Sequence, residues 1–236
     1  MKLNNTLMQS TNSDTSYFMR NKFPWASMLE ENWKDIKAEM QLVLDHSDVL
    51  PYKNRWFLAH PHYVKSQNKE AWKTYEFYFF GIKQMNHCLN CPKTYALLQK
   101  IPDLVTAQFS LLSPKTRVEP HLGYSRMVLR NHLALEIPSQ DLCKIKVEDE
   151  ETSWTEGQVI TFDDSKMHEA WNLSDNRRIV LMIDVANPEG EYNGEQINRY
   201  KIENIDDPFL LNIADNKTWA DWLDKGIFPE ESVNKQ

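Results

Sequence analysis

Short segments in which apolar and polar residues alternate are the feature that most constrains the fold of this chain. The clearest are residues 127–137 and 178–185, where apolar side chains recur at nearly every second position. Successive side chains of a β-strand point to opposite faces, so this period predicts strands with one apolar face. Shorter strands are expected at residues 143–147 and 158–162 and around Phe109. Because polar turns rather than helices separate these strands, the pattern favours a β-sandwich or barrel.

Helices are expected on both sides of this β-rich region. Residues 27–30 have the form of a capping box, and apolar residues recur at helical spacing over residues 29–45. A second short helix is expected over residues 92–100, because proline is favoured in the first turn of a helix. Trp219 and Trp222 predict a further short helix near the C-terminus.

The chain has 236 residues, of which 41% are hydrophobic, which suits one domain with a sizeable core. Residues 1–17 are rich in Asn, Ser and Thr and predict a flexible tail. Residues 18–190 are expected to form a single β-rich domain with N-terminal helices. Residues 191–236 are expected to form an extension that docks on this domain.

The composition restricts the possible partners. A net charge of -7 argues against a broad nucleic-acid surface, which needs clustered Lys and Arg, but it leaves room for a small anionic ligand. Three cysteines are too few for a disulfide scaffold, and no stretch approaches 18 apolar residues. We therefore expect a cytoplasmic protein without a transmembrane segment, for which a homo-oligomer is possible.

Two histidines at the ends of predicted strands, His121 and His168, are candidate ligands of divalent iron. Neutral imidazole binds this metal well, and oxygenases leave coordination positions open for the co-substrate and O₂. The usual facial triad adds a carboxylate two residues after the first histidine, but that residue is Gly123 here. Glu119 and Glu169 do not have the usual spacing either. From spacing alone, a structural role for each histidine stays open.

Nearby cations strengthen the metal hypothesis. Arg178 begins the last predicted strand, and the hairpin before it returns the chain towards His168. A buried arginine can hold a carboxylate with two parallel hydrogen bonds. Arg130 and His132 share one face of their predicted strand, where they would meet either a bound anion or solvent. The alternation alone is compatible with both arrangements.

An ordered series of motifs resembles the aspartyl/asparaginyl β-hydroxylase family. The motifs lie at residues 109–123, 129–138, 143–147, 154–158, 162–165, 168–171 and 178–181. The similarity covers roughly residues 23–188. It implies a mainly β protein with flanking helices and a double-stranded β-helix, the jelly-roll or cupin-like fold. It also implies an iron site made by His121 and His168 without a carboxylate, because this family has glycine at the position of Gly123.

The resemblance further implies a dioxygenase that uses Fe(II), 2-oxoglutarate and O₂. The expected reaction couples oxidative decarboxylation of 2-oxoglutarate to hydroxylation of an unactivated carbon, expected to be the β-carbon of an amino acid that is free, peptide-borne or carrier-tethered. Ser110 and Arg178 would bind the distal carboxylate of 2-oxoglutarate, and Arg130 and His132 would lie near its other end or near the substrate. Residues expected to contact the substrate or support the iron ligands are Gly123, Arg126, Asp164, Glu169 and Trp171.

The sequence departs from the animal peptide hydroxylases of this family at Val128, where those enzymes carry an arginine. Arg126 is the nearest cation. This difference argues against an aspartyl-peptide substrate. Bacterial relatives act on lipid acyl chains, free amino acids or carrier-tethered amino acids, so the substrate class stays open.

Two further hypotheses come from other classes of protein. The chain could be a catalytically silent cupin-like module that binds a small acid or a partner. Alternatively, Cys88 and Cys91 could form part of a zinc-dependent interaction module, and His60 and His62 could be a second ligand pair. Packing and surface-loop roles are the simpler interpretation of these four residues.

Overall fold

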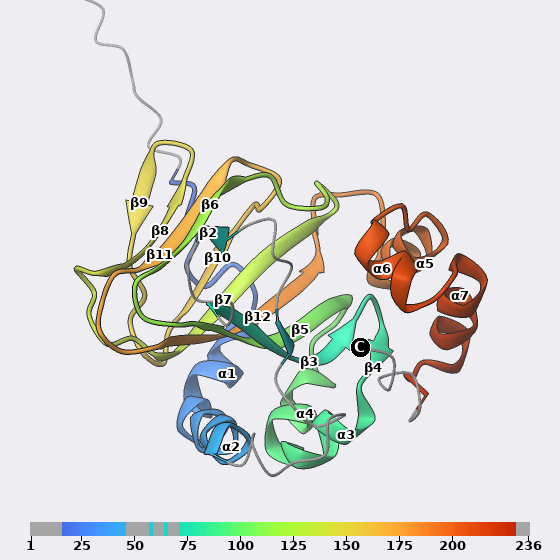
Figure 1. Ribbon diagram of the computed structural model, residues 1–236, viewed down its shortest axis with the longest axis horizontal. Helices are drawn as coiled ribbons and strands as arrows, with labels where there is room; N and C mark the ends of the chain where they lie inside the picture. Colours follow the sequence, from blue (N-terminus) through green and yellow to red (C-terminus); the bar gives the residue numbers. More distant parts are fainter. Residues whose placement is uncertain (1–15, 46–56, 59–63, 66–70, 230–236) are drawn as a thin grey trace, which may run out of the picture.

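The computed structural model describes residues 16–45, 57–58, 64–65 and 71–229. In this part of the chain, two antiparallel sheets lie against each other, with helices beneath them and a helical cluster at one side (Figure 1). The strands are β1 (Phe57–Leu58), β2 (Val64–Lys65), β3 (Trp72–Phe79), β4 (Ile82–Lys83), β5 (Leu104–Leu112), β6 (Thr116–His121), β7 (Val128–Glu136), β8 (Cys143–Val147), β9 (Glu150–Thr152), β10 (Val159–Phe162), β11 (His168–Asn172) and β12 (Arg178–Ala186). The helices are α1 (Ala26–Glu31), α2 (Trp33–Asp45), α3 (Met85–Asn90), α4 (Pro92–Leu98), α5 (Gly194–Glu203), α6 (Pro208–Ile213) and α7 (Asn216–Lys225).

The strand order defines a double-stranded β-helix. The larger sheet runs β1-β3-β5-β12-β7-β10, with β4 beside β3, and the smaller sheet runs β2-β6-β11-β8-β9. From β5 onward the chain passes back and forth between the sheets, and the last strand, β12, lies between β5 and β7. This is the winding of a jelly roll. The expected fold, mainly β with flanking helices, is confirmed.

The strands expected from alternation are present with nearly the predicted bounds. Residues 127–137 contain β7, residues 178–185 lie within β12, and residues 143–147 are β8. All nine residues of β12 are buried, so both faces of this strand are covered. The polar face of the alternating pattern therefore points into the protein and not into solvent.

The outer face of the larger sheet is covered by the N-terminal helices. Ile36 and Met40 of α2 belong to the same apolar cluster as Leu133 of β7 and Leu181 of β12. This helix layer lies below the sheet in Figure 1. The opposite face, inside the barrel, has its own apolar cluster, which includes the buried Trp154.

The predicted capping box at residues 27–30 is wrong. Helix α1 begins at Ala26, and its N-cap residue, Trp25, makes no side-chain cap. Glu30 instead accepts a hydrogen bond at 2.7 Å from the backbone N–H of Val159 in β10. A tertiary contact has replaced the local one, and the helix expected over residues 29–45 is divided at Asn32.

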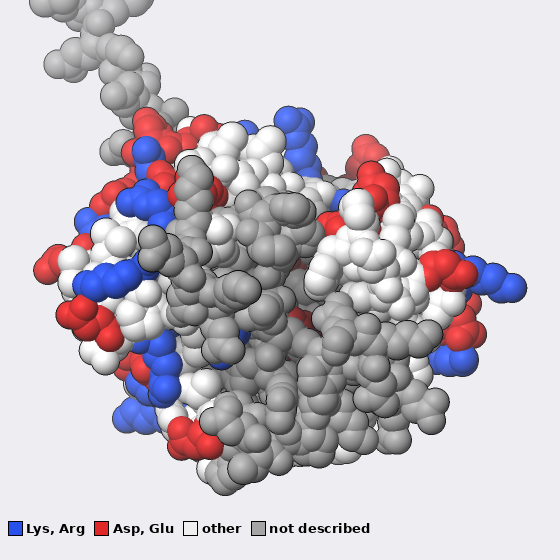
Figure 2. Space-filling model, viewed as in Figure 1, with Lys and Arg blue, Asp and Glu red and all other residues white. Residues whose placement is uncertain are grey.

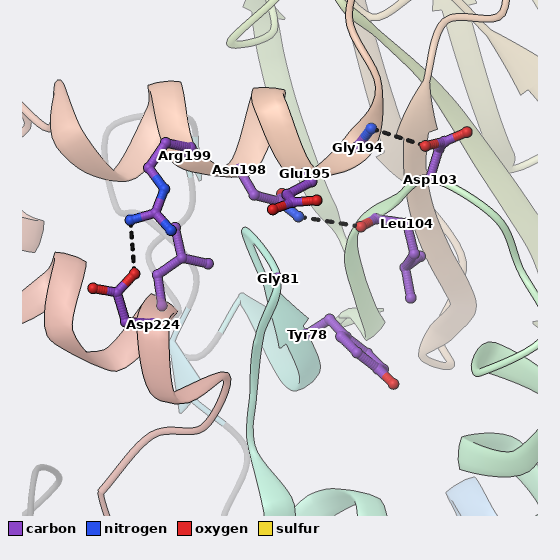
Figure 3. A pocket seen from close by; sticks show the side chains of 10 residues that line it. Tyr78, Gly81, Asp103, Leu104, Gly194, Glu195, Asn198, Arg199 and Asp224 are labelled. Carbon is purple, nitrogen blue, oxygen red and sulfur yellow. Dashed lines mark hydrogen bonds and ion pairs between the residues drawn. The ribbon is translucent and has the colours of Figure 1, made fainter.

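Of the C-terminal helices, α5 packs against β5 and β12, and α7 packs against β4. Trp219 and Trp222 of α7, where a helix was expected, share an apolar cluster with Val128 and Ala186. Figure 3 shows two polar attachments of α5 around a cavity of about 540 Å³. The Gly194 N–H donates to Asp103 at 3.0 Å, and Asn198 Nδ2 donates to the Leu104 carbonyl at 3.4 Å.

No helix in the described ranges is long and apolar enough to cross a membrane. Figure 2 shows acidic and basic side chains interspersed on one face of the molecule, particularly on the left of the view. Residues 1–15 of the expected tail and the His60–His62 pair lie outside the described residues. Ser16 and Tyr17 are described, and both are hydrogen-bonded to Glu150.

A buried carboxylate joins α2 to α4. Glu39 accepts hydrogen bonds from the backbone N–H groups of Lys93 and Thr94, both at 2.8 Å, and from the Thr94 hydroxyl at 2.7 Å. Both N–H groups lie in the first turn of α4, where backbone N–H groups have no acceptor within the helix. Pro92 at the start of α4 confirms the helix predicted there.

Glu39→Ala should lower the free energy of unfolding by about 2 to 4 kcal/mol, because it leaves buried donors without an acceptor. Urea denaturation of the purified protein measures this change. Glu31→Ala, at an exposed position of α1, is the control and should have little effect. Equal midpoints for the Glu39 variant and the wild type would contradict this assignment.

Candidate metal centre

His121 and His168 are neighbours on adjacent strands of the smaller sheet. His121 ends β6, His168 begins β11, and the two residues are direct partners in the antiparallel register. Their ring centroids are 4.2 Å apart, with the ring planes inclined by 52°. The strand pairing thus brings together two imidazoles that are far apart in the sequence.

Each imidazole has its tautomer fixed by a backbone carbonyl two residues earlier. His121 Nδ1 lies 2.8 Å from the Glu119 oxygen, and His168 Nδ1 lies 2.9 Å from the Lys166 oxygen. A carbonyl can only accept, so each Nδ1 carries the proton and each Nε2 keeps a lone pair. Burial lowers the pKa of both side chains, that of His168 to about 3, and the Arg130 charge acts in the same direction. Both rings are therefore neutral near pH 7, as metal ligation requires.

The space in which a third ligand would begin is filled by Asp164. A Cβ atom on Gly123 would lie 2.2 Å from Asp164 Oδ2, and the Gly123 N–H donates to the Asp164 carbonyl at 2.7 Å. A carboxylate carried by residue 123 is thus sterically excluded. Within the described residues, no group of three or more His, Cys, Asp or Glu side chains could hold a metal ion. The same finding gives no support to a zinc site at Cys88 and Cys91, which are both buried free thiols.

Arg130 connects Asp164 to β12. Its Nε and Nη2 donate to the two carboxylate oxygens of Asp184 at 2.8 Å, and Nη2 lies 2.9 Å from Asp164 Oδ2. The hydroxyls of Thr106 and Tyr124 also donate to Asp184, both at 2.9 Å. Burial raises the pKa of Asp164 to about 7, although the Arg130 charge opposes this shift. The guanidinium is held by two carboxylates of the protein. Its expected place near 2-oxoglutarate or the substrate stays a prediction.

Arg178, unlike Arg130, is a buried cation that contacts no carboxylate among the described residues. It is 3% exposed, its Nη1 donates to the Ser110 carbonyl at 3.3 Å, and its guanidinium lies over the Trp154 ring at 4.8 Å. Its Nε has no hydrogen-bond partner in the part of the chain that is described. Burial lowers the pKa of Arg178 to about 10. A buried cation without a carboxylate partner is costly, so this position calls for an anion.

His132 provides a second unused donor on the same inner face. Trp154 Nε1 donates to His132 Nδ1 at 3.3 Å, which places the ring proton on Nε2. This Nε2 is buried and has no partner among the described atoms. Burial, followed by the Arg178 charge, lowers the pKa of His132 well below its usual value. Ser110 on β5, whose carbonyl accepts from Arg178, is also buried.

The other predicted site residues lie further out. Arg126 is exposed in the loop between β6 and β7. Glu169 and Trp171 pair with Lys146 and Lys144 of β8, whereas His168 pairs with Val147, so strand alternation turns them to the opposite face of the sheet. There Arg117 binds Glu169 at 2.7 Å and lies over the Trp171 ring at 4.6 Å. The structure therefore does not place Glu169 and Trp171 beside the imidazoles, as had been expected from their closeness to His168 in the chain.

Sequence reasoning missed Asp184, Tyr124 and Trp154. Asp184 alternates in step with Arg178 along β12, so a carboxylate on the inward face was a visible signal. Tyr124 and Trp154 gave no comparable signal, because loops bring them to the site.

Two imidazoles thus meet at one end of the double-stranded β-helix, and a buried guanidinium without a carboxylate partner among the described residues lies inside it. Together they define a candidate metal centre. A profile of the aspartyl/asparaginyl β-hydroxylase family matches residues 30–188. The chain belongs to this family.

Its relatives include hydroxylases from bacteria and animals. The chain is 38% identical over 168 residues to an ornithine lipid ester-linked acyl 2-hydroxylase from Rhizobium tropici, covering 70% of this chain and 58% of that protein. It is 36% identical over 166 residues to the aspartyl/asparaginyl β-hydroxylase of Homo sapiens, covering 68% of this chain and 21% of that protein. A Pseudomonas putida prolyl-4-hydroxylase has 13% sequence identity and a TM-score of 0.43, covering 72% of this chain and 91% of that one. The chain thus spans less than two thirds of both sequence relatives.

Gly123→Ala should lower the free energy of unfolding by about 1 to 3 kcal/mol, because the added methyl group overlaps Asp164. Thermal or urea unfolding of the metal-free protein measures this cost. Gly190→Ala is the control, since its Cβ would meet no atom closer than 3.1 Å. A Gly123 variant as stable as the wild type would contradict the close approach of Gly123 and Asp164.

Proposed function

We propose that this protein is an Fe(II)- and 2-oxoglutarate-dependent hydroxylase with His121 and His168 as the iron ligands. The observation that carries the proposal is a pair of buried donors, Arg178 Nε and His132 Nε2, for which the described residues provide no acceptor. Both donors lie in the barrel that carries the paired imidazoles. Such donors fit a small dicarboxylic acid. Membership of a family whose relatives are named as hydroxylases supports the same reaction class.

The residues have distinct roles in this proposal. The Nε2 atoms of His121 and His168 would hold the iron, which supplies the oxidising chemistry with O₂ and 2-oxoglutarate when bound. Arg178 would hold the distal carboxylate of 2-oxoglutarate by parallel hydrogen bonds, with Ser110 beside it. The apolar cluster around Trp154 would exclude water from the ion pair between Arg178 and this carboxylate, which strengthens their attraction.

His132 and Asp164 would act near the other end of the co-substrate. The Nε2–H of His132 can donate to an anionic oxygen without carrying a charge itself. Asp164 can hold or release a proton near neutral pH, since its pKa is raised to about 7. Arg130 would orient Asp164 and Asp184, and its place near the other end of 2-oxoglutarate or near the substrate is kept in this proposal.

We propose the β-carbon of an amino acid, free, peptide-borne or carrier-tethered, as the position hydroxylated. Val128 replaces the arginine of the animal peptide hydroxylases and is fully buried in the C-terminal cluster. Position 128 therefore cannot offer a cation to an acidic peptide. Leu122 and Met167, exposed at 56% and 43%, flank the two candidate ligands and favour a substrate with an apolar part. An acyl chain, named for the Rhizobium relative, is the competing substrate class.

Purified protein with Fe(II) and O₂ should form succinate from 2-oxoglutarate, and His168→Ala should abolish this activity. Arg178→Lys should raise the KM for 2-oxoglutarate about tenfold to a hundredfold, because lysine cannot make the two parallel hydrogen bonds. Arg177→Lys is the matched control, since Arg177 binds Glu136 on the outer side.

Succinate formation that survives loss of both His121 and His168 would rule out this site. The catalytically silent alternative predicts binding of a small acid through Arg178 without turnover. Anaerobic Fe(II) titration separates the two, because only the hydroxylase requires one iron per chain at the two imidazoles.

Mass spectrometry should detect the gain of one oxygen atom in a substrate from a panel of free amino acids, carrier-tethered aminoacyl groups and acyl lipids. Amino-acid products support the proposed carbon. A product found only among acyl lipids would reject the amino-acid substrate while leaving the iron chemistry intact.

A further inference from the structure

The C-terminal helices lie beyond the family-matched residues 30–188, yet one of their side chains reaches the loop after His121. Lys201, near the end of α5, donates from Nζ to the Tyr124 carbonyl at 2.5 Å. The same ammonium lies 5.1 Å from the centre of the Tyr124 ring. One partly buried lysine thus contacts both the backbone and the ring of the same residue.

Tyr124 also contacts the carboxylates of the candidate site. Its hydroxyl donates to Asp184 at 2.9 Å, and Asp184 binds Arg130 through both oxygens. Arg130 also binds Asp164, whose carbonyl accepts from the Gly123 N–H at 2.7 Å. Hydrogen bonds and ion pairs therefore connect α5 without a break to Gly123, two positions after His121.

Helix α5, which carries Lys201, is itself attached to the rest of the protein at its start and along its apolar side. Helix α5 begins with a capping box of Asn193 and Gln196, and its first turns are attached to Asp103 and Leu104 (Figure 3). Its apolar side shares the cluster that contains both tryptophans of α7. Because α5 is fixed in this way, the lysine can restrain the loop instead of following it.

Loop residues 122–127 are also attached to the body near both ends, where the Gly123 N–H donates to Asp164 and the Met127 carbonyl accepts from the Asn187 N–H at 2.8 Å. Tyr124 and Met127 pack on the C-terminal cluster, while Leu122 and Arg126 are exposed. The Gly123 N–H bond to Asp164 lies two residues after the candidate metal ligand His121. Without the Lys201 ammonium, the Tyr124 carbonyl would lose the donor that connects the middle of this loop to α5.

We propose that Lys201 is a positioning residue of the candidate metal centre, holding the loop of residues 122–127 so that Gly123 and Asp164 stay in contact beside His121. The inference rests on the proposed function for the identity of the metal. The C-terminal helices are then a working part of the site and not only an appendage to the barrel.

The test compares Lys201→Met, which keeps the length of the side chain and removes the ammonium, with Lys225→Met as the control. Lys225 forms an exposed ion pair with Asp221 on α7. Hydrogen exchange of the metal-free protein should become about tenfold faster in residues 122–127 of the Lys201 variant and stay unchanged in the control. Fe(II) affinity, measured anaerobically, should fall about tenfold, the lower end of the effect of groups that orient metal ligands.

Lys201→Arg keeps the positive charge and should restore most of the exchange protection and the Fe(II) affinity. Unchanged exchange in residues 122–127 of Lys201→Met, or an affinity loss equal in the Met and Arg variants, would overturn the inference. Exchange at Trp219 and Trp222 reports whether α7 stays docked, and equal losses of protection there and in the loop would also overturn it. If wild-type protein binds no Fe(II), the proposed function fails, whereas loop exchange still decides whether Lys201 restrains the loop.

Discussion

The guanidinium of Arg130, held between the buried carboxylates of Asp184 and Asp164, is the interaction on which the candidate site depends. A carboxylate or guanidinium charge buried alone costs several kcal/mol, so the ion pairs among these three groups stabilise one another. They belong to β7, to β12 and to the turn before β11. Their pairing therefore fixes the end of the barrel at which His168 meets His121.

Arg178 is a cation in the same barrel that has no carboxylate partner among the described residues. Arg178 is 3% exposed and the Arg130 side chain 12%, but Arg130 has two carboxylates, whereas Arg178 has a carbonyl and an aromatic ring. Desolvation disfavours the charge of both side chains. This contrast supports the proposal that Arg178 binds an anion, whereas Arg130 holds two carboxylates of the protein itself. The orphaned Nε2–H of His132 lies on the same inner face and favours the same anion.

Local patterns were sufficient to predict most of the fold. Alternation predicted β7, β8, β10 and β12, and Pro92 marked the start of α4, because these signals depend on neighbouring residues. The capping box failed because Glu30 bonds to β10 instead. Closeness to His168 suggested roles for Glu169 and Trp171, but alternation turns them outward. The contacts of Asp184, Tyr124 and Lys201 join distant segments, so only the folded chain reveals them.

An anaerobic crystal structure with Mn(II) in place of iron and with 2-oxoglutarate would show whether the two imidazoles and Arg178 form one site. We expect one metal ion bound by Nε2 of His121 and Nε2 of His168, with the distal carboxylate of the acid on Arg178. A metal ion bound elsewhere, or an acid that leaves Arg178 without a carboxylate, would contradict this expectation.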